Sequence, residues 1–268
     1  MLGFTVLTIV WGAWVRISSS GDGCGNHWPL CKKSFLPNDL AASIEWLHRL
    51  TSGLALLFIF ALCYFAFKIY PKKHLLRKLS LFAVVLILIE ALIGALLVLN
   101  QLVGFNQSSL RVIVLGIHLI NSLILVGVLT LCWQSACFKK ITIKQPHIYF
   151  LSGFLFLALT GNIASLAGVL FPSISLMESL ALDFLPNAHI SLKIRFLHPL
   201  IALLFLIFLG LNHLMKTKLF LFALLTALFG LWTLLSLSPV WMKLSHLFIA
   251  YLLWIVFVSF SFQFHKTK

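Results

Sequence analysis

Apolar residues form long runs in this sequence, and polar residues are concentrated in the short segments between the runs. A helix needs roughly 20 apolar residues to cross the hydrocarbon layer of a membrane, and most of the runs reach about this length. The expected spans are residues 2–17, 43–70, 79–101, 110–134, 148–171, 194–215, 219–237 and 240–262. We therefore expect an all-α membrane protein with eight transmembrane helices and little chain left over for a soluble domain.

The composition and charge of the chain support a membrane protein. Hydrophobic residues make up 61% of the chain and charged residues 10%, whereas about a quarter of the residues in a soluble domain are charged. The formal charge of +14 does not indicate a nucleic-acid partner, because the basic residues lie between hydrophobic runs and form no single stripe. Membrane lipid is therefore the expected surrounding.

The basic residues are distributed unequally between the two sides of the expected spans. One side carries twelve of the twenty basic residues and no acidic residue. These twelve are Lys68, Lys72, Lys73, Arg77, Lys78, Lys139, Lys140, Lys144, Lys216, Lys218, Lys266 and Lys268. Because basic connections tend to face the cytoplasm, we expect both termini to be cytoplasmic and the loop at residues 18–42 to face outward.

The first expected span is short, and no basic segment precedes it. A signal peptide is therefore an alternative interpretation of this span. Residues 18–20 show no clear cleavage site, however, and removal of the span would break the internal repeat of the chain. A start codon assigned slightly too late would also explain the short span.

Two parts of the chain repeat the same motifs in the same order. Residues 44–50 (IEWLHRL) match residues 194–200 (IRFLHPL), and residues 90–94 (EALIG) match residues 226–230 (TALFG). A histidine also recurs early in the fourth and eighth expected spans. Such a repeat indicates a duplicated architecture.

The repeat predicts two four-helix halves, residues 1–137 and residues 138–268. Because four is an even number of spans, both halves have the same orientation, and a pseudo-twofold axis is expected along the membrane normal. Gly94 and Gly230 occupy matching positions, where a small residue allows two helices to approach closely.

Four histidines recur at matching positions inside the expected spans. His48 and His118 lie in the first half and His198 and His246 in the second, all within a few turns of the outer ends of their helices. Within a half, the second and fourth helices run in the same direction, so the two imidazoles reach a similar depth and can approach opposite faces of a haem. We therefore expect each half to bind one haem between two axial histidines.

Two other interpretations of these histidines stay open. A single buried histidine is more often a hydrogen-bonded part of the core than a ligand, although polar residues inside a membrane are costly and tend to be functional. Zinc usually takes three or four protein ligands, and each pair offers only two. We expect the remaining histidines to be solvated or interfacial, with His189 the strongest candidate for an exception. These are His27, His74, His147, His189, His213 and His265.

The halves differ at the entrance to each expected haem pocket. Glu45 lies three residues before His48 and thus on the same helical face, whereas Arg195 takes the matching position in the second half. A carboxylate here can act as a base toward water or stabilise a developing cation, so Glu45 is the candidate catalytic residue. Arg195 and Arg49 are the candidate cofactor-binding residues, because a guanidinium pairs well with carboxylates such as haem propionates. Alternatively, Glu45 and Arg49 are interfacial charges that mark the start of a helix.

Cys24 and Cys31 lie in the first expected outer loop, where an oxidising compartment permits a disulfide. Closing so short a loop would contribute roughly 2–3 kcal/mol in the chain-entropy model. The pair could be a structural staple, a rigid lid over the first pocket, or a thiol pair that passes electrons. Cys63, Cys132 and Cys137 are expected to be ordinary small residues or free thiols.

Glu90 is a further difference between the halves, because Thr226 takes its matching position. A charged residue in the middle of a span usually belongs to a functional or well-paired site. The sequence assigns no partner to Glu90.

The ordered set of motifs resembles the haem A synthase family of bacteria and mitochondria, over nearly the whole chain. The residues that carry the resemblance are 12–16, 28–31, 44–49, 92–99, His118, 160–166, 170–172, 195–199, Pro239 and His246. The resemblance implies an eight-helix duplicated bundle in the inner membrane of a bacterial cell, which oxidises the methyl group of haem O to the formyl group of haem A for cytochrome oxidase.

The resemblance also implies roles for particular residues and partners. His48 and His118 would bind haem O, Glu45 would be the catalytic carboxylate, and His198 and His246 would bind a resident haem B. Expected partners are a haem O synthase and components of cytochrome oxidase assembly, and a homo-oligomer stays open. Some family members have a second cysteine pair in the third outer loop. Residues 171–193 contain no cysteine, which argues against a mechanism that requires a disulfide in both halves.

Two other function classes use the same histidines. A dihaem electron carrier similar to cytochrome b561 would pass electrons across the bilayer, but it needs haems near opposite faces, whereas all four histidines are expected near the outer face. A haem-binding transporter would use the pockets for binding alone. In that class Glu45 would be dispensable.

Overall fold

The computed structural model of the chain describes residues 1–31, 37, 39–136, 140–143, 145–212 and 217–265. Nearly all of this part of the chain is helical. The helices are α1 (Leu2–Ile17), α2 (Leu40–Ile69), α3 (Leu75–Leu99), α4 (Ser109–Ser135), α5 (Gln145–Leu170), α6 (Leu176–Asp183), α7 (Ile190–Arg195), α8 (Leu197–Leu211), α9 (Thr217–Leu235) and α10 (Val240–Ser261). Two short strands, β1 (Lys140–Ile143) and β2 (Phe262–His265), pair antiparallel.

Seven helical segments of the described chain are long and apolar enough to cross a membrane. They are α2, α3, α4, α5, α7 together with α8, α9 and α10. Helix α1 has 16 residues, so at about 1.5 Å per residue it is shorter than the roughly 30 Å hydrocarbon layer. The prediction of an all-α membrane protein is confirmed, while an eighth span at α1 stays a prediction.

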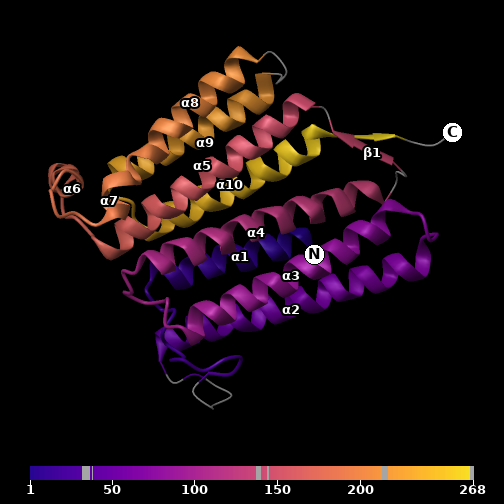
Figure 1. Cartoon of the computed structure of the whole chain (residues 1–268), viewed down its shortest axis with the longest axis horizontal. Helices are drawn as coiled ribbons and strands as arrows, with labels where there is room; N and C mark the ends of the chain where they lie inside the picture. The colour runs from indigo at the N-terminus through magenta and orange to yellow at the C-terminus, as the bar shows by residue number, and fades with distance from the viewer. Residues whose placement is uncertain (32–36, 38, 137–139, 144, 213–216, 266–268) are drawn as a thin grey trace.

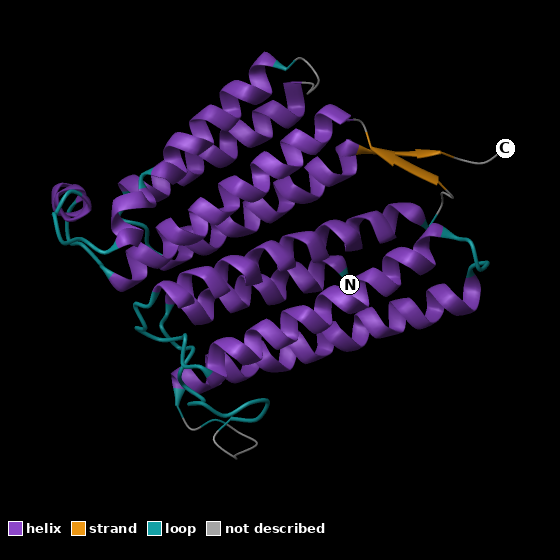
Figure 2. Ribbon diagram, viewed as in Figure 1, coloured by secondary structure: helices purple, strands orange, loops and turns teal. Residues whose placement is uncertain are grey.

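The helices are arranged in two groups that lie side by side (Figures 1 and 2). One group contains α1, α2, α3 and α4, and the other contains α5, α8, α9 and α10. Helices α1 and α4 of the first group contact α5 and α10 of the second. The expected boundary between the halves, at residues 137 and 138, falls at residues that lie outside the described chain, and the pseudo-twofold axis stays a prediction.

The two groups are joined by polar as well as apolar contacts between α4 and α10. The indole Nε1 of Trp254 donates a hydrogen bond to the backbone oxygen of Leu123 at 2.7 Å. One turn earlier, the hydroxyls of Ser122 and Tyr251 lie 2.7 Å apart. Apolar side chains from both groups, among them Val126, surround these contacts in one buried cluster. The groups therefore form a single packed unit.

Polar side chains set the starts of several helices. The Asp39 carboxylate accepts a hydrogen bond from the backbone N–H of Ala42 at the start of α2, and the Ser108 hydroxyl accepts one from Arg111 at the start of α4. A helix leaves its first N–H groups without partners, so such caps stabilise the chosen boundary.

The sixth expected span differs from the prediction of one continuous helix at residues 194–215. The helical segment begins earlier, at Ile190, and is interrupted at Phe196 between α7 and α8. Pro199 has no N–H to donate to the backbone oxygen of Arg195, which removes one bond of the helical ladder at this point. In the first half Arg49 takes the position that matches Pro199. Arginine has a backbone N–H, and α2 is continuous there. Helix α8 ends at Leu211, and residues 213–215 lie outside the described chain.

Two features of the fold were not predicted from the sequence. Helix α6 forms in the connection after α5, where the Ser175 hydroxyl caps the N–H of Glu178 at 3.1 Å. The strand pair joins Lys140 in register with His265, at the end of the bundle opposite to α6 (Figure 1). Eight residues of helix and four of strand are too short to stand out as periodic patterns in an apolar sequence.

We predict that the Trp254→Phe substitution lowers the stability of the protein in detergent. The substitution keeps the aromatic ring and removes the donor to Leu123, and a net hydrogen bond contributes about 1 kcal/mol. Thermal unfolding monitored by circular dichroism measures the effect. Trp241→Phe on the same helix is the matched control, because Trp241 is 59% exposed. Equal melting temperatures for both variants would contradict the prediction.

Candidate functional site

The four candidate histidines lie near the same end of the bundle. His48, His118 and His246 are in the first three turns of α2, α4 and α10, and His198 is in the first turn of α8. Those helices start at the end of the bundle that carries α6 and the loop after α1 (Figure 1). The structure thus places all four imidazoles at one level of the bundle.

Each of these histidines faces a glycine on another helix of the same group. The pairs are Gly12 and His48, Gly94 and His118, Gly161 and His198, and Gly230 and His246. A glycine removes the side chain that would otherwise occupy the space of the ring, so an imidazole fits between two closely packed helices.

The fit between ring and glycine is tight in three of the four pairs. A methyl group added to Gly12, Gly161 or Gly230 would lie 2.6, 2.8 or 2.7 Å from the Cε1 atom of the facing ring, which is too close for two carbon atoms. At Gly94 the same distance is 4.0 Å, an ordinary contact. At these three positions the absence of a side chain on glycine leaves the space that the facing ring occupies.

The second pair has the spacing that a shared metal atom requires. The ring centres of His198 and His246 are 6.4 Å apart. A metal with an imidazole nitrogen about 2 Å away on each side would hold the two ring centres roughly 6 Å apart. The residues present therefore fit an iron porphyrin between α8 and α10.

The hydrogen bonding of His198 also fits a ligand role. The Thr160 hydroxyl donates its proton to the backbone oxygen of Leu157 at 2.8 Å, and its oxygen lies 3.3 Å from Nδ1 of His198. While that hydroxyl donates to Leu157, its oxygen is free to accept a hydrogen from Nδ1 of His198. In the tautomer with the hydrogen on Nδ1, the lone pair of Nε2 is left for a metal.

The Nδ1 atoms of the remaining three rings are buried. Those of His48, His118 and His246 have no aligned hydrogen-bond partner among the described residues. The rings themselves are only half-buried. Such rings are suited to bind a ligand through the other nitrogen.

A zinc site of the usual kind is less compatible with these side chains. Over the described ranges, no three His, Cys, Asp or Glu side chains are grouped as metal ligands. Structural and catalytic zinc sites generally use at least three such ligands. The donor set that the structure offers is two histidines in each half.

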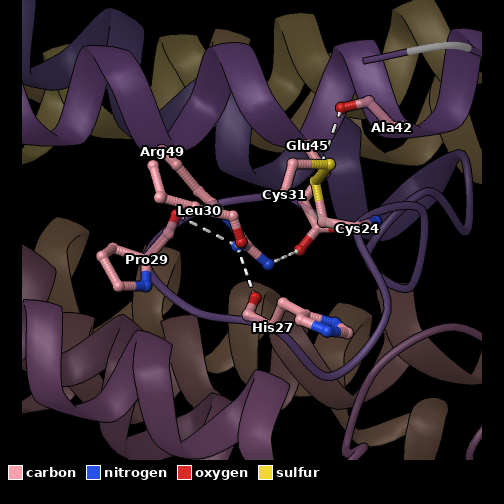
Figure 3. A network of polar contacts seen from close by, with 8 residues as sticks. All are labelled: Cys24, His27, Pro29, Leu30, Cys31, Ala42, Glu45 and Arg49. Atoms are coloured by element: carbon pink, nitrogen blue, oxygen red, sulfur yellow. Dashed lines mark hydrogen bonds and ion pairs between the residues drawn. A yellow bond between two sulfur atoms is a disulfide. The ribbon is translucent and has the colours of Figure 1, made fainter. Parts of the chain in front are cut away.

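Glu45 lies at the start of α2 and is 3% exposed. Its Oε2 atom accepts a hydrogen bond from the backbone N–H of Cys24 at 2.8 Å, and its Oε1 atom pairs with the guanidinium of Arg49 one turn along the same helix. Figure 3 shows these contacts. The carboxylate therefore connects α2 to the cysteine loop, one turn before His48.

The cysteine loop is closed by a disulfide between Cys24 and Cys31, as the sequence allowed. Arg49 fastens this loop, because its Nη1 atom donates to the backbone oxygens of His27 at 2.7 Å, Leu30 at 3.1 Å and Pro29 at 3.2 Å (Figure 3). A guanidinium is suited to such multiple contacts because its donors are planar and fixed. These contacts attach the loop to the start of α2.

A cavity of about 440 Å³ separates the cysteine loop from the connection between α3 and α4. Asp22, Gly25 and Asn26 line it on one side, and Gln101 and Phe105 are among the residues on the other. This cavity lies at the same end of the first group of helices as Glu45.

Arg195 does not occupy the same environment as Glu45. Its Nε atom pairs with Asp183 Oδ1 at 2.6 Å, and Nη2 donates to the backbone and hydroxyl oxygens of Ser179 at 2.6 Å. Arg195 therefore connects α7 to α6. Binding of a cofactor by Arg195 or Arg49 stays a prediction, and in the structure both guanidiniums are engaged by protein groups.

Glu90, which had no partner in the sequence analysis, faces His118. Its Oε1 atom lies 3.3 Å from Nδ1 of His118, and Asn121 donates to its other oxygen. The sequence signal that could have found this contact is the spacing of Asn121, which lies one helical turn after His118.

Two further basic residues near the site were not identified from the sequence. Arg16 on α1 donates to Asn162 and, at 3.2 Å, to the Ser165 hydroxyl on α5. A methyl group on Gly168 would lie 3.6 Å from Nζ of Lys243. Both cations thus lie against one face of α5, and Lys243 is one turn before His246.

The other histidines have mixed outcomes. His189 caps α7, where its Nδ1 atom accepts from the backbone N–H of Ser191 at 3.2 Å. His74 and His147 are only 8% and 3% exposed, so a solvated position is wrong for them, and an interfacial position stays a prediction. His74 caps α3, and His147 stacks on Phe260 with ring centres 5.5 Å apart. The positions of the side chains of His213 and His265 lie outside the described residues, as does Cys137.

Comparison with known proteins gives a family match over most of the chain. Residues 38–258 match the model of the family COX15-CtaA, described as "Cytochrome oxidase assembly protein". The chain is 40% identical over 96 residues to "Heme A synthase" of Symbiobacterium thermophilum, which covers 35% of this chain and 31% of that protein. It is 37% identical over 92 residues to "Heme A synthase" of Bacillus cereus, which covers 34% of this chain and 30% of that protein.

A longer match extends over almost all of the chain. It is 35% identical over 280 residues to "Protoheme IX farnesyltransferase" of Thermus thermophilus, and the match covers 96% of this chain and 46% of the relative. The chain therefore spans about half the length of this relative.

We predict that a methyl group at the tight glycine positions weakens binding of an iron porphyrin. In Gly161→Ala and Gly230→Ala the facing ring has to move, and overpacking of this kind costs about 1–3 kcal/mol, which corresponds to roughly tenfold or more in affinity. Titration of the purified protein with ferric haem, followed by the absorption of six-coordinate low-spin iron, measures the effect. Gly94→Ala is the matched control, because its methyl group has room, and an equal loss in this control would contradict the prediction.

We also predict that Arg49 protects the disulfide loop. Arg49→Gln removes the contacts to three backbone oxygens, so the loop should open more often and Cys24–Cys31 should be reduced faster by a water-soluble thiol. Labelling of the released cysteines over time measures the rate. Lys193→Gln is the control, because Lys193 contacts the backbone oxygen of Pro186 in the second half at 2.7 Å. Equal reduction rates in the two variants would show that Arg49 does not hold the loop.

Proposed function

The chain belongs to the COX15-CtaA family of cytochrome oxidase assembly proteins, and we propose that it is a haem A synthase, which oxidises the methyl group of haem O to the formyl group of haem A. Haem A synthases that match part of the chain support an oxidoreductase of this kind. The structural observation that carries the proposal is the 6.4 Å distance between the ring centres of His198 on α8 and His246 on α10.

The second half is proposed to hold the resident haem B. His198 and His246 would be its axial ligands, and the Thr160 hydroxyl, 3.3 Å from Nδ1 of His198, would accept the Nδ1 hydrogen. Bound there, the haem would supply one-electron transfer. Gly161 and Gly230 leave the space that both rings occupy.

The first half is proposed to bind the substrate, haem O, between His48 and His118. Conversion of a methyl group to a formyl group removes four electrons and four protons overall when the oxygen is counted as water. Two successive hydroxylations, followed by loss of water from the resulting diol, accomplish this change. The electrons leave to an external acceptor, and the protein has to position the ring, handle the protons and limit the access of water.

Glu45 is proposed to handle the protons at the entrance to this pocket. It lies one turn from His48, and its carboxylate can take a proton from water or stabilise positive charge that develops on the substrate. The Cys24 N–H and the Arg49 guanidinium hold its orientation. The disulfide loop covers this carboxylate. We assign no electron transfer to the disulfide.

The charged groups at the same end of the bundle suit the propionates of the two porphyrins. Arg195 and Arg49 keep the cofactor-binding role expected from the sequence, and each would have to exchange a protein contact for a propionate. Lys243 lies one helical turn before His246 and on the same face of α10. This turn is the natural position for a propionate partner.

The proposed setting is the inner membrane of a bacterial cell, with both termini in the cytoplasm and the histidine and cysteine end facing outward. The proposed partners are a haem O synthase, which would supply the substrate, and components of cytochrome oxidase assembly. Support for the first partner comes from the Thermus thermophilus relative, in which a segment similar to this chain is part of a longer protein named for farnesyl transfer to protohaem IX.

The position of the histidines disfavours a carrier that moves electrons across the bilayer. Such a carrier needs haems near opposite faces, whereas all four histidines lie in the first turns of their helices, and these helices start at one end of the bundle (Figure 1). A haem-binding transporter has the same pockets but leaves the haem chemically unchanged. Analysis of the haem product separates it from an enzyme.

We predict that replacement of Glu45 abolishes haem A production while haem binding persists. The full chain is co-expressed with a haem O synthase, and extracted haems are separated by chromatography. In Glu45→Gln and Glu45→Ala the yield of haem A should fall by about 10²-fold or more, the usual contribution of a general base, and haem O should accumulate. The absorption spectrum of the purified variants should retain the low-spin haem signal.

Glu178→Gln is the control for this experiment, because Glu178 is an exposed carboxylate on α6 at the same end of the bundle. Unchanged haem A in the Glu45 variants would remove Glu45 from the mechanism. If the wild-type chain binds haem but leaves haem O unmodified, the proposed enzyme activity is wrong and the protein is a carrier or a transporter.

A further inference from the structure

A carboxylate inside the first group of helices faces one of the proposed iron ligands. Glu90 lies in the second half of α3, and its Oε1 atom is 3.3 Å from Nδ1 of His118 on α4. The two side chains are only 16% and 26% exposed. An ionisable group at this depth is costly in a membrane, so its retention opposite a histidine suggests a role.

Asn121 fixes the direction of this carboxylate. Its Nδ2 atom donates to Glu90 Oε2 at 2.5 Å and to the backbone oxygen of Leu86 at 3.0 Å. Leu86 precedes Glu90 by one helical turn, and Asn121 follows His118 by one turn. The amide therefore holds one carboxylate oxygen and leaves the other directed at the imidazole.

The matching position in the second half works differently. The Thr226 hydroxyl donates to the backbone oxygen of Phe222 on its own helix at 2.8 Å, and Nδ1 of His246 has no hydrogen-bond partner among the described residues. The only hydroxyl proton of Thr226 is therefore used in a hydrogen bond within α9. No carboxylate of the described chain replaces Glu90 within ion-pair distance of His246.

The two rings are also held in different ways. His246 packs tightly on Gly230, where an added methyl group would be 2.7 Å from the ring. His118 stands back from Gly94, where the corresponding distance is 4.0 Å. One ligand is thus positioned by packing, while the other has freedom to turn and a carboxylate beside it.

We propose that Glu90 is a positioning residue that accepts the Nδ1 hydrogen of His118 and so directs Nε2 of this ring to the porphyrin iron of the first pocket. In the present structure Nδ1 of His118 has no aligned acceptor, so a small rotation of the ring brings the hydrogen onto Glu90 Oε1. A carboxylate bonded to the far nitrogen of a metal-bound histidine fixes its tautomer and raises its basicity.

This arrangement makes the two pockets electronically unequal. A more basic imidazole donates more charge to iron and stabilises the ferric state, so the haem in the first pocket should have a lower midpoint potential than it would without Glu90. The second pocket has no such carboxylate. The inference rests on the proposed binding of a porphyrin by His48 and His118, but it does not depend on oxidation of the methyl group.

The test measures the haem of the first pocket alone. The His246→Ala substitution removes a ligand of the second pocket, and the full chain in this background is titrated with ferric haem b. Glu90→Gln keeps the size of the side chain and its contact with Asn121, while Glu90→Thr reproduces the second half. The readouts are the affinity for ferric haem, the midpoint potential by spectroelectrochemistry and the electron paramagnetic resonance of the low-spin ferric state.

Both Glu90 variants should raise the midpoint potential and weaken ferric haem binding by about tenfold or more, the usual effect of removing such a partner. If ferrous haem binding is unaffected, a tenfold loss corresponds to a shift of 59 mV for one electron. Asn121→Ala should shift the potential in the same direction by a smaller amount, because the carboxylate stays but loses its orientation. Thr226→Val, measured in the otherwise unmodified chain, is the matched control and should leave the potentials of both haems unchanged.

Bound haem with an unchanged potential and resonance spectrum in Glu90→Gln would overturn the inference, because a merely structural carboxylate would change stability alone. Absence of haem from the first pocket of the His246→Ala parent would overturn both the inference and the ligation by His48 and His118. A chain that binds haem with the expected shift in midpoint potential, but produces no haem A, would refute the proposed enzyme activity. The role proposed for Glu90 would still stand.

Discussion

An imidazole can lie between two membrane helices only where the neighbouring backbone leaves space and where its nitrogens find partners. In this protein glycine supplies the space for all four rings, and an alanine methyl group at three of these positions would require the facing ring to move. The nitrogens are treated less uniformly, because His198 faces a hydroxyl, His118 faces a carboxylate, and the rest have no aligned partner among the described residues. A buried polar atom without a partner costs free energy. Binding of a metal at the opposite nitrogen of the same ring would offset that cost.

The first half adds a polar assembly that the second half does not reproduce. Glu45 and Arg49 on α2 hold the disulfide loop through one N–H group and three carbonyl groups. At the corresponding place in the second half, Arg195 holds α6 through Asp183 and Ser179. The same position on the repeated helix therefore anchors a different segment in each half, and in the first half this anchor includes Glu45, one turn before His48.

The contact between the two groups of helices also sets the position of one proposed pocket relative to the other. Helix α4 carries His118 and α10 carries His246, and these two helices meet through Ser122 and Tyr251 about one turn deeper than the histidines. Trp254 and Leu123 extend the contact along the same helices. Because the interface is packed and hydrogen-bonded, the separation of the two pockets is fixed by the fold.

The sequence by itself determined the all-α membrane fold, the four histidines and the differences at Glu45 and Glu90, because long apolar runs and repeated motifs are properties of the chain order alone. It allowed the disulfide without deciding its role. Only the tertiary structure decided that Glu90 faces His118, that Arg49 fastens the loop, and that Arg195 is engaged by Asp183, because each contact joins residues on different helices or loops. The break at Phe196 has a local cause in Pro199. In contrast, α6 and the strand pair depend on how the ends of the bundle pack, and no periodic pattern in so apolar a sequence predicts this packing.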